Sequence, residues 1–404
     1  MNELPQPELE SLYVSLPTRL RELIFLFLKL GAISFGGPAA HIALIEAEIV
    51  RKRQWVTHRQ FLDMLGAANL IPGPTSTEMA INVGFVRAGC AGLCVAGVSF
   101  IVPAALITGA FAWTYVRYGA MPQAASVLMG IKPAVVAVIA IAIWRLGKAA
   151  VKDLGLGVLA VLSLAAFFLG VNPMLILFAG GALGMVVRQA PKTLTAGVVL
   201  IPVIRAKPGW RLISASASAI SVAGSAITRP SVWRIALLFL KVGAVLYGGG
   251  YVLLAFLEQG LVQQHAWLTR PQLLDAIAIG QFTPGPVLST ATFIGYILGG
   301  VPGATVATVG IFLPSFFYVA LLAPVLFRLR QSRWIAAFLD SVNVGAVALM
   351  AGVTVRLGAD TLRSWQMWLI AAASLIVLLR WKVSPAWVVL GGGIGGLLLA
   401  TIRG

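Results

Sequence analysis

The sequence predicts an all-α polytopic membrane protein built from two homologous halves, arranged as inverted-topology repeats with broken or re-entrant helices in each half. Three observations lead to this prediction. Charged residues are scarce and are separated by long apolar runs. One stretch of sequence recurs in the second half of the chain. The recurring motifs contain residues that the interior of a regular helix excludes.

The composition is that of a chain embedded in lipid. Of its 404 residues 59% are hydrophobic and 11% are charged, and its mean hydropathy is +0.94. A soluble domain carries about 25% charged residues, so this chain has too few to cover a water-facing surface. Residues 88–116, 154–187 and 276–327 contain no Asp, Glu, Lys or Arg. A spanning helix needs roughly 20 such residues, so the last two runs each have room for two passes.

The internal repeat defines the domain organisation. Lys29 and Lys241 lie 212 positions apart within closely similar segments. The same offset aligns Pro72-Gly73-Pro74 with Pro284-Gly285-Pro286. Self-similarity of this length indicates a duplication. We therefore divide the chain into a polar cytoplasmic tail (1–18), membrane repeat one (19–188), a linker (189–232) and membrane repeat two (233–404).

The distribution of basic residues predicts that the halves face opposite ways. At one pair of corresponding loops, half one carries Arg51, Lys52, Arg53 and Arg59, whereas half two carries only Arg270. Two loops further on the bias reverses, with Arg117 alone in half one against Arg328, Arg330 and Arg333 in half two. Since cytoplasmic loops are rich in Lys and Arg, this pattern favours inverted repeats. The linker must then cross the membrane, and residues 212–228 are the segment we expect to do so.

The helix breaks predict where a site lies. Pro-Gly-Pro cannot continue a helix, and in each half a capping box opens a short helix just before it, at Thr57 or Thr269. Further helices begin after it, at Thr75 and at Ser289 or Thr290. Helix starts near the membrane midplane direct free N–H groups and a positive dipole end at the same point. The alternative is that the breaks only shape the helices for packing, but two pairs in register favour an anion-binding site.

Two sets of residues follow from this reasoning. The first is the expected substrate-binding set: Gly36, Gly37, His41, Pro72, Gly73, Pro74, Thr75, Ser76, Thr77, Gly248, Gly249, Pro284, Gly285, Pro286, Ser289, Lys29 and Lys241. The second is the expected coupling or gating set: Glu46, Glu78, Glu258, Asp63, Asp275 and Arg87.

Each charged residue in an apolar segment also has a simpler interpretation. The side chains of Lys29 and Lys241 could bind an anion or snorkel to the interface. Glu46 and Glu258 could carry protons or hold a lysine in an ion pair. The carboxylates of Asp63 and Asp275 could bond to backbone groups that are left free at the helix breaks.

Half one differs from half two at several of these positions. Glu78 and Arg87 have Thr290 and Leu298 as their counterparts, and Lys132 has Asn343. This asymmetry predicts that half one retains more of the chemistry. His41 could titrate near neutral pH or serve as a packed, hydrogen-bonded residue.

Other classes of function find little support in the sequence. A net charge of +17 could suit nucleic acid, but the Lys and Arg residues form short clusters between apolar runs, so we expect lipid and no nucleic acid as a partner. Without a metalloprotease or phosphate-loop motif, we expect neither an enzyme with catalytic residues nor a metal or cofactor. Gly391, Gly395 and Gly396 have the spacing of close helix packing, which would allow a homodimer contact.

The motifs resemble those of the chromate ion transporter family. The resemblance rests on Phe-Gly-Gly-Pro-x-x-His from Phe35 to His41, on Trp-x-Thr-x-x-Gln-x-x-Asp from Trp55, and on Pro-Gly-Pro-Thr-Ser-Thr-Glu ending at Glu78. It extends from about residue 20 to the C-terminus and corresponds to the family's long, two-domain type. Half two has Gly250 where half one has Pro38 and lacks the His and Thr-Ser-Thr-Glu elements, so the polar roles of half one do not carry over to it.

The resemblance implies a multi-pass carrier of the bacterial inner membrane that exports chromate and confers chromate resistance, with sulfate-like oxyanions as structural analogues. The alternative is a carrier for uptake or exchange of sulfate, molybdate or a related oxyanion, because helix N-termini recognise charge and shape rather than the central atom.

Overall fold

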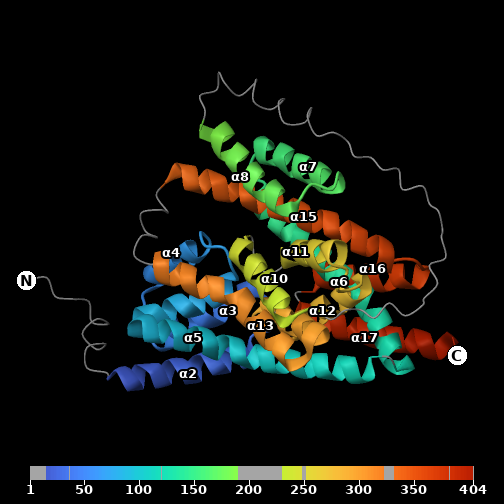
Figure 1. Cartoon of the computed structure of the whole chain (residues 1–404), viewed down its shortest axis with the longest axis horizontal. Coiled ribbons are helices and arrows are strands. Elements are labelled where there is room, and N and C mark those ends of the chain that lie inside the picture. The colour runs from blue at the N-terminus through green and yellow to red at the C-terminus, as the bar shows by residue number, and fades with distance from the viewer. Residues whose placement is uncertain are drawn as a thin grey trace, which may run out of the picture.

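The computed structural model describes residues 15–35, 37–119, 121–189, 230–247, 252–322, 332–381 and 383–403. The predicted tail lies largely outside these residues, as does the linker with its proposed crossing at 212–228. The described residues form helices and the loops between them, with no strand among them (Figure 1).

The two halves repeat one order of elements. Half one contains α2 (Leu16–Ile33), α3 (Pro38–Glu46), the π-helical η1 (Ala47–Lys52), α4 (His58–Ala68), α5 (Thr75–Tyr118), α6 (Pro122–Ala150), α7 (Leu154–Phe168) and α8 (Pro173–Gln189). Half two contains α10 (Val232–Val245), α11 (Leu253–Leu257), the π-helical η2 (Glu258–Gln264), α12 (Arg270–Phe282), the 3₁₀ turn η3 (Val287–Ser289), α13 (Thr290–Leu322), α15 (Arg333–Thr361), α16 (Trp365–Arg380) and α17 (Pro385–Arg403). Even the π-helical turn recurs at the same place, which confirms two homologous halves.

The short helices before Pro-Gly-Pro begin as the sequence predicted. Thr57 caps α4 and Thr269 caps α12, each through a reciprocal capping box with the glutamine three residues on. Both helices end before the prolines. The breaks in the two halves are therefore local consequences of sequence, since caps and prolines act within one turn of a helix.

Helices α5 and α13 each contain a sharp reversal that the sequence analysis did not foresee. Ala88 and Gly89 leave helical geometry in α5, as Gly299 and Gly300 do in α13. Gly89 has φ +59° and Gly300 has φ +62°, a conformation that glycine adopts without strain. After the reversal Gly92 packs directly against Gly84. Residues 75–87 therefore form a short arm folded back along the remainder of α5.

The pairing of α4 with this short arm makes a re-entrant element. Arg87, at the end of the arm, stacks over the ring of Trp55, which precedes α4, at 4.8 Å. The two ends of the element thus meet at its base, and Pro-Gly-Pro forms its tip. This arrangement confirms the prediction of re-entrant helices in half one.

Corresponding long helices of the two halves run antiparallel. In the α5–α13 pair, Gly97 faces Phe316, while the later Gly109 faces Thr292. Thr292 is hydrogen-bonded to Thr308, which precedes Phe316 on the limb after the reversal. In the α6–α15 pair, Gly147 faces Val347 and Gly358 faces Val136. These four helices are the ones long and apolar enough to cross a membrane among the described residues. Corresponding spans that run in opposite directions make the halves inverted repeats.

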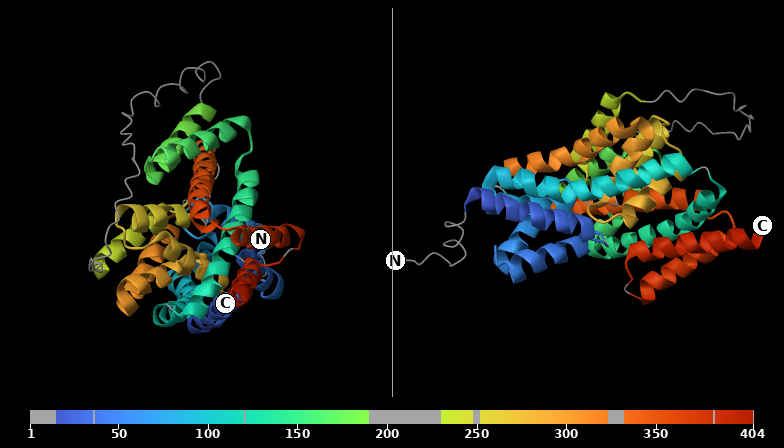
Figure 2. Two further views of the ribbon diagram at one scale, coloured as in Figure 1. Left: turned by 90° about the vertical axis from the view of Figure 1, so that its right-hand side faces the viewer. Right: turned by 90° about the horizontal axis from the view of Figure 1, so that it is seen from below.

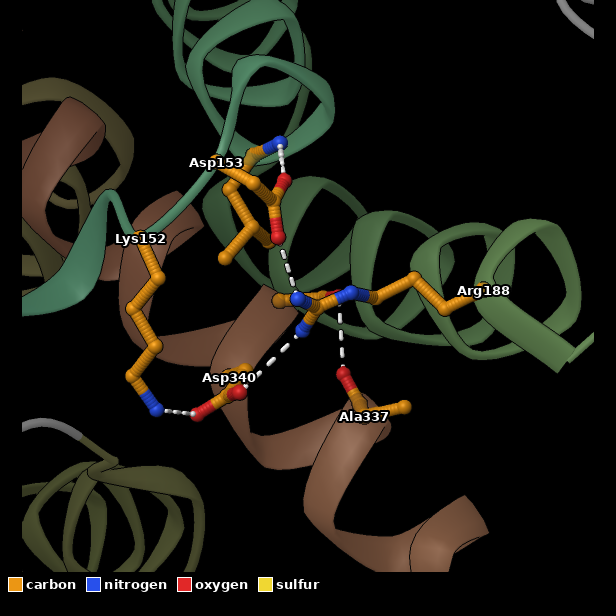
Figure 3. Close-up of polar contacts among 7 residues, drawn as sticks. Lys152, Asp153, Arg188, Ala337 and Asp340 are labelled. Atoms are coloured by element: carbon orange, nitrogen blue, oxygen red, sulfur yellow. Dashed lines mark hydrogen bonds and ion pairs between the residues drawn. The ribbon is translucent and has the colours of Figure 1, made fainter.

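The halves also exchange their final helices. Helix α15 of half two packs against α7 and α8 of half one, and α6 of half one packs against α16 and α17 (Figures 1 and 2). Figure 3 shows one such contact, where Asp340 of α15 accepts from Lys152 at 2.7 Å and from Arg188 at 3.1 Å. Asp153 pairs with the same Arg188. The exchange binds each half to the other around the centre.

Candidate functional site

The two Pro-Gly-Pro tips lie where the halves meet. The backbone N–H of Gly285 donates to the carbonyl of Ser34, in the break after α2, at 2.8 Å. A Cβ on Gly285 would collide with Ala104 of α5, and one on Gly73 would collide with Ser315 of α13. Each tip therefore inserts against the long helix of the opposite half. This reciprocal contact places both tips near the pseudo-two-fold axis of the fold.

The helices that begin at the breaks have no side-chain cap, which is also true of α2, α6 and α10. Within each re-entrant element only the short helix that leads to the tip is capped. Helices α4 and α12 have capping boxes, whereas α3, α5, α11 and η3 have no side-chain cap. In α5 the first backbone bonds run from Thr77 and Glu78 to the carbonyl of Pro74, so the N–H groups of Thr75 and Ser76 precede the hydrogen-bonded ladder. Uncapped N–H groups at a helix start are suited to binding an anion.

Buried polar side chains without hydrogen bonds gather on the half-one side. Glu78 and Thr77 are fully buried, as is Ser315 across the interface. Neither carboxylate oxygen of Glu78 has a hydrogen-bond partner in the described structure, nor do the hydroxyls of the other two. A Cβ on Gly73 would collide with both Oε1 of Glu78 and Oγ of Ser315. These groups therefore lie close to one another around Gly73.

Two further unpartnered polar residues lie beside the break after α2, where Ser34 bonds the half-two tip. His41 is buried beside the break, with its ring in a T-shaped contact with Phe100 at 6.1 Å. Its ring nitrogens and the hydroxyl of Ser34 form no well-aligned hydrogen bond in the described structure. Leaving a buried polar group unpaired costs about 1–3 kcal/mol. The unpaired groups beside each tip therefore make the breaks candidate ligand sites.

The hydroxyls at the start of the half-two break are hydrogen-bonded, one of them by a residue of half one. Thr108 donates to Ser289 at 3.1 Å, and Thr290 donates to the carbonyl of Val287 at 2.8 Å. Val319 stands in half two at the position that corresponds to Thr108, so no equivalent hydroxyl bonds the half-one residues. The hydroxyls at the two breaks are therefore bonded differently, and which half retains more of the chemistry stays a prediction.

Lys132, the lone lysine in an apolar run of half one, has its partner in half two. Nζ of Lys132 on α6 lies 3.4 Å from Oδ1 of Asp275 on α12, and the hydroxyl of Tyr115 donates to Oδ2 of the same carboxylate at 3.0 Å. Asp275 therefore bonds to side chains of the other half, and the structure does not support the interpretation of it as a backbone-bonding residue. The signal in the sequence was the lone lysine in an apolar run, because a buried charge needs an opposite charge nearby.

Other expected site residues lie away from the tips. Nζ of Lys29 lies 3.4 Å from Glu48, and its side chain is 57% exposed. Glu48 also binds Lys52 at 2.9 Å and Arg53 at 2.5 Å. The sequence had instead indicated Glu46 as the acid that pairs with a lysine. Oε1 of Glu46 itself lies 3.7 Å from Arg51.

The remaining members of the two sets are dispersed. Arg87 binds Glu22 at 2.9 Å, and the buried Glu258 pairs with Arg270 at 3.4 Å. Asp63 is half-buried on α4. Lys241 lines a separate surface cavity. Gly36, Gly248 and Gly249 lie outside the described residues.

The architecture defines the class of protein. Inverted repeats, exchanged helices and paired helix breaks that meet at the centre are the plan of a membrane transporter. The sequence profile of the chromate transporter family matches twice, over residues 21–185 and 233–397. The chain belongs to the chromate transporter family.

Individual relatives agree with this assignment. A chromate transport protein of Cupriavidus metallidurans is 33% identical over 382 residues, which cover 94% of this chain and 93% of the relative. A chromate transport protein of Pseudomonas aeruginosa is 30% identical over 397 residues, covering 96% and 94%. An uncharacterized transporter of Bacillus subtilis is 29% identical over 158 residues, which are 38% of this chain but 89% of that protein. A relative of about one repeat in length fits an origin by duplication. No solved structure matches the chain.

Proposed function

We propose that the protein is a secondary transporter that exports chromate across the bacterial inner membrane. The observation that carries the proposal is the set of uncapped helix starts beside Thr77 and Glu78, at the contact between the inverted halves. Chromate and sulfate are tetrahedral dianions that accept hydrogen bonds from several directions. Backbone N–H groups of Thr75 and Ser76, with the hydroxyls of Thr77 and Ser315, supply donors of that kind.

The membrane potential favours export. Moving one charge through 100 mV changes the free energy by about 2.3 kcal/mol, so a dianion that leaves an inside-negative cell gains roughly twice that amount. Export needs no further coupled ion, whereas uptake would need cations or protons to offset the charge. The inverted halves would give alternating access by moving around the central tips.

The potential alone suffices for export, and Glu78 is the residue that we propose to bind and release a proton when a pH gradient also drives flux. It is fully buried and has no cation or hydrogen-bond donor paired with it in the described structure. An isolated carboxylate in such a place costs many kcal/mol, so the neutral acid is the form that fits. A neutral Glu78 would also donate its O–H to the oxyanion, whereas an ionised one would repel it. Glu46 and Glu258, by contrast, are paired with basic residues.

Flux measurements on purified protein in liposomes test this function. We expect radiolabelled chromate to follow an imposed potential, and sulfate or molybdate to compete with it. The assignment of the substrate would be refuted if sulfate and molybdate did not inhibit chromate flux, or if no gradient produced chromate flux. Accumulation of sulfate or molybdate against its own gradient would favour the uptake or exchange carrier instead.

A further inference from the structure

A second basic site lies on the surface of half two, away from the Pro-Gly-Pro tips. A cavity of about 300 Å³ is bounded by α10, by η2 and the loop that follows it, and by the connection from α7 to α8. Its lining includes Arg234, Lys241, Gln259, Gln264, His265 and Trp267, and no acidic residue is among the described residues that line it. This volume is at the lower end of the range of small-molecule sites, roughly 300–1,000 Å³.

The two cations point to one side of α10. Arg234 and Lys241 are seven residues apart, which is about two turns and 10.5 Å along the helix axis. Both are exposed, and neither forms an ion pair within the described part of the chain. The acid on η2, Glu258, is buried and binds Arg270 and Gln263 instead. The positive charge in this cavity is therefore not balanced by a neighbouring carboxylate.

The corresponding surface of half one shows which charged residues differ between the halves. Lys29 is the counterpart of Lys241, and it belongs to a cluster of three cations around the carboxylate of Glu48. The counterpart of Glu48 is Gly260, which lines the cavity. The counterpart of Glu22, which binds Arg87 in half one, is Arg234. Half two thus lacks both acids at this place and has the additional cation Arg234. Gln264 and His265 stand where half one has Lys52 and Arg53.

We propose that this cavity binds a tetrahedral oxyanion, which takes the place that the Glu48 carboxylate holds in half one. The ligand chemistry is shared by a free oxyanion such as sulfate and by the phosphate of an anionic lipid headgroup. Arg234 and Lys241 supply charge, while the amides of Gln259 and Gln264 supply neutral donors. Nδ1 of His265 lies 2.7 Å from the carbonyl oxygen of Gly260, and this hydrogen bond orients the ring.

The inverted fold places this site on one membrane face only. Corresponding positions of antiparallel halves lie at opposite faces, so the cavity lies opposite the Arg51, Lys52 and Arg53 cluster. For an exporter with that cluster in the cytoplasm, the site is on the outer face. An oxyanion there would lie on the face to which an exporter releases its substrate.

The most direct test restores the missing acid. Gly260→Glu places a carboxylate where half one has Glu48, and the Cβ would meet only the flexible side chain of Leu238, at 3.4 Å. Gly260→Gln is the matched variant of equal size without charge. The thermal midpoint of unfolding would be measured in zwitterionic lipid with sulfate against chloride at equal ionic strength. In a second arm, phosphatidylglycerol vesicles replace sulfate.

The experiment is run both in the parent and in a Gly73→Ala background, in which we expect the central site to be blocked, so that its outcome does not depend on transport. We expect sulfate or phosphatidylglycerol to raise the midpoint by a few degrees in that background and in Gly260→Gln. The rise should be absent in Gly260→Glu and in the double variant that combines Arg234→Gln with Lys241→Gln. A rise with sulfate identifies the free anion, and a rise with phosphatidylglycerol alone identifies the headgroup. No rise with either ligand, or a rise that survives in both loss variants, would overturn the proposal.

Discussion

Lys132 and Asp275 form an ion pair between the halves, with Nζ of the lysine 3.4 Å from Oδ1 of the aspartate. The pair joins α6 to the re-entrant helix α12, and Tyr115 completes it. At the corresponding positions the other side has Asn343 and Asp63, so this pair has no exact counterpart. It therefore fixes one re-entrant element and not the other.

Replacing Lys132 by Met should destabilise the protein, because it leaves the buried Asp275 without its cation. Removing one partner of a buried pair costs about 3–5 kcal/mol. The additional change Asp275→Asn should recover most of the loss. The thermal midpoint of the purified protein, read for both single variants and the double variant, measures the coupling.

Lys152→Met is the matched control, since its side chain is 55% exposed in a pair with Asp340. An exposed pair contributes about 0–1 kcal/mol, so this variant should unfold close to the parent. Equal losses for Lys132→Met and Lys152→Met would contradict the distinction drawn between a buried and a surface pair.

Gly73→Ala should abolish transport. The added methyl group would collide with Glu78 and Ser315, and Gly73 has φ +151°, so overpacking of about 1–3 kcal/mol is expected along with backbone strain. Gly391→Ala on α17 is the control, because its Cβ would meet nothing within 4 Å. Flux and thermal midpoint should both be retained in the control. Normal flux in Gly73→Ala would place the anion elsewhere.

Glu78→Gln should separate the two driving forces. Gln imitates the neutral acid but cannot release a proton, so flux driven by a pH gradient should vanish while flux driven by potential persists. Glu46→Gln tests the rival proton carrier, Glu46, whose side chain is 21% exposed and paired with Arg51. Loss of the pH response in Glu46→Gln, with the response intact in Glu78→Gln, would assign the proton to the other residue.

Stability should fall in acid through Glu48. Its hydrogen bond from Lys52, with those from Lys29 and Arg53, lowers the pKa of this carboxyl from 4.5 to about 2. A lowered pKa stabilises the folded state fully above about pH 4.5, and the gain is lost as pH falls towards 2. The difference in thermal midpoint between the parent and Glu48→Gln should therefore shrink from pH 7 to pH 3. A difference that stays constant over this range would contradict the assignment. Solvent around the exposed lysines keeps the whole effect modest.

Local sequence signals were reliable for the elements they control. The Thr57–Gln60 and Thr269–Gln272 capping boxes and the helix starts after Pro-Gly-Pro are found where expected. The reversal at Ala88 and Gly89 was not predicted, because a single glycine in an apolar run gives no sign of whether the chain turns. Only the packing of Gly92 against Gly84 makes that turn evident.

Sequence alone determined that this chain lies in a membrane, that it is a duplication, and that both copies break at the same points. These are consequences of composition and of residues acting on their own backbone. Tertiary structure decided which polar groups are left without partners at the breaks, which lysine binds which acid, and where a cavity replaces a carboxylate. Such pairings join residues far apart in the chain, and an ion pair or a cavity exists only once the two halves have packed together.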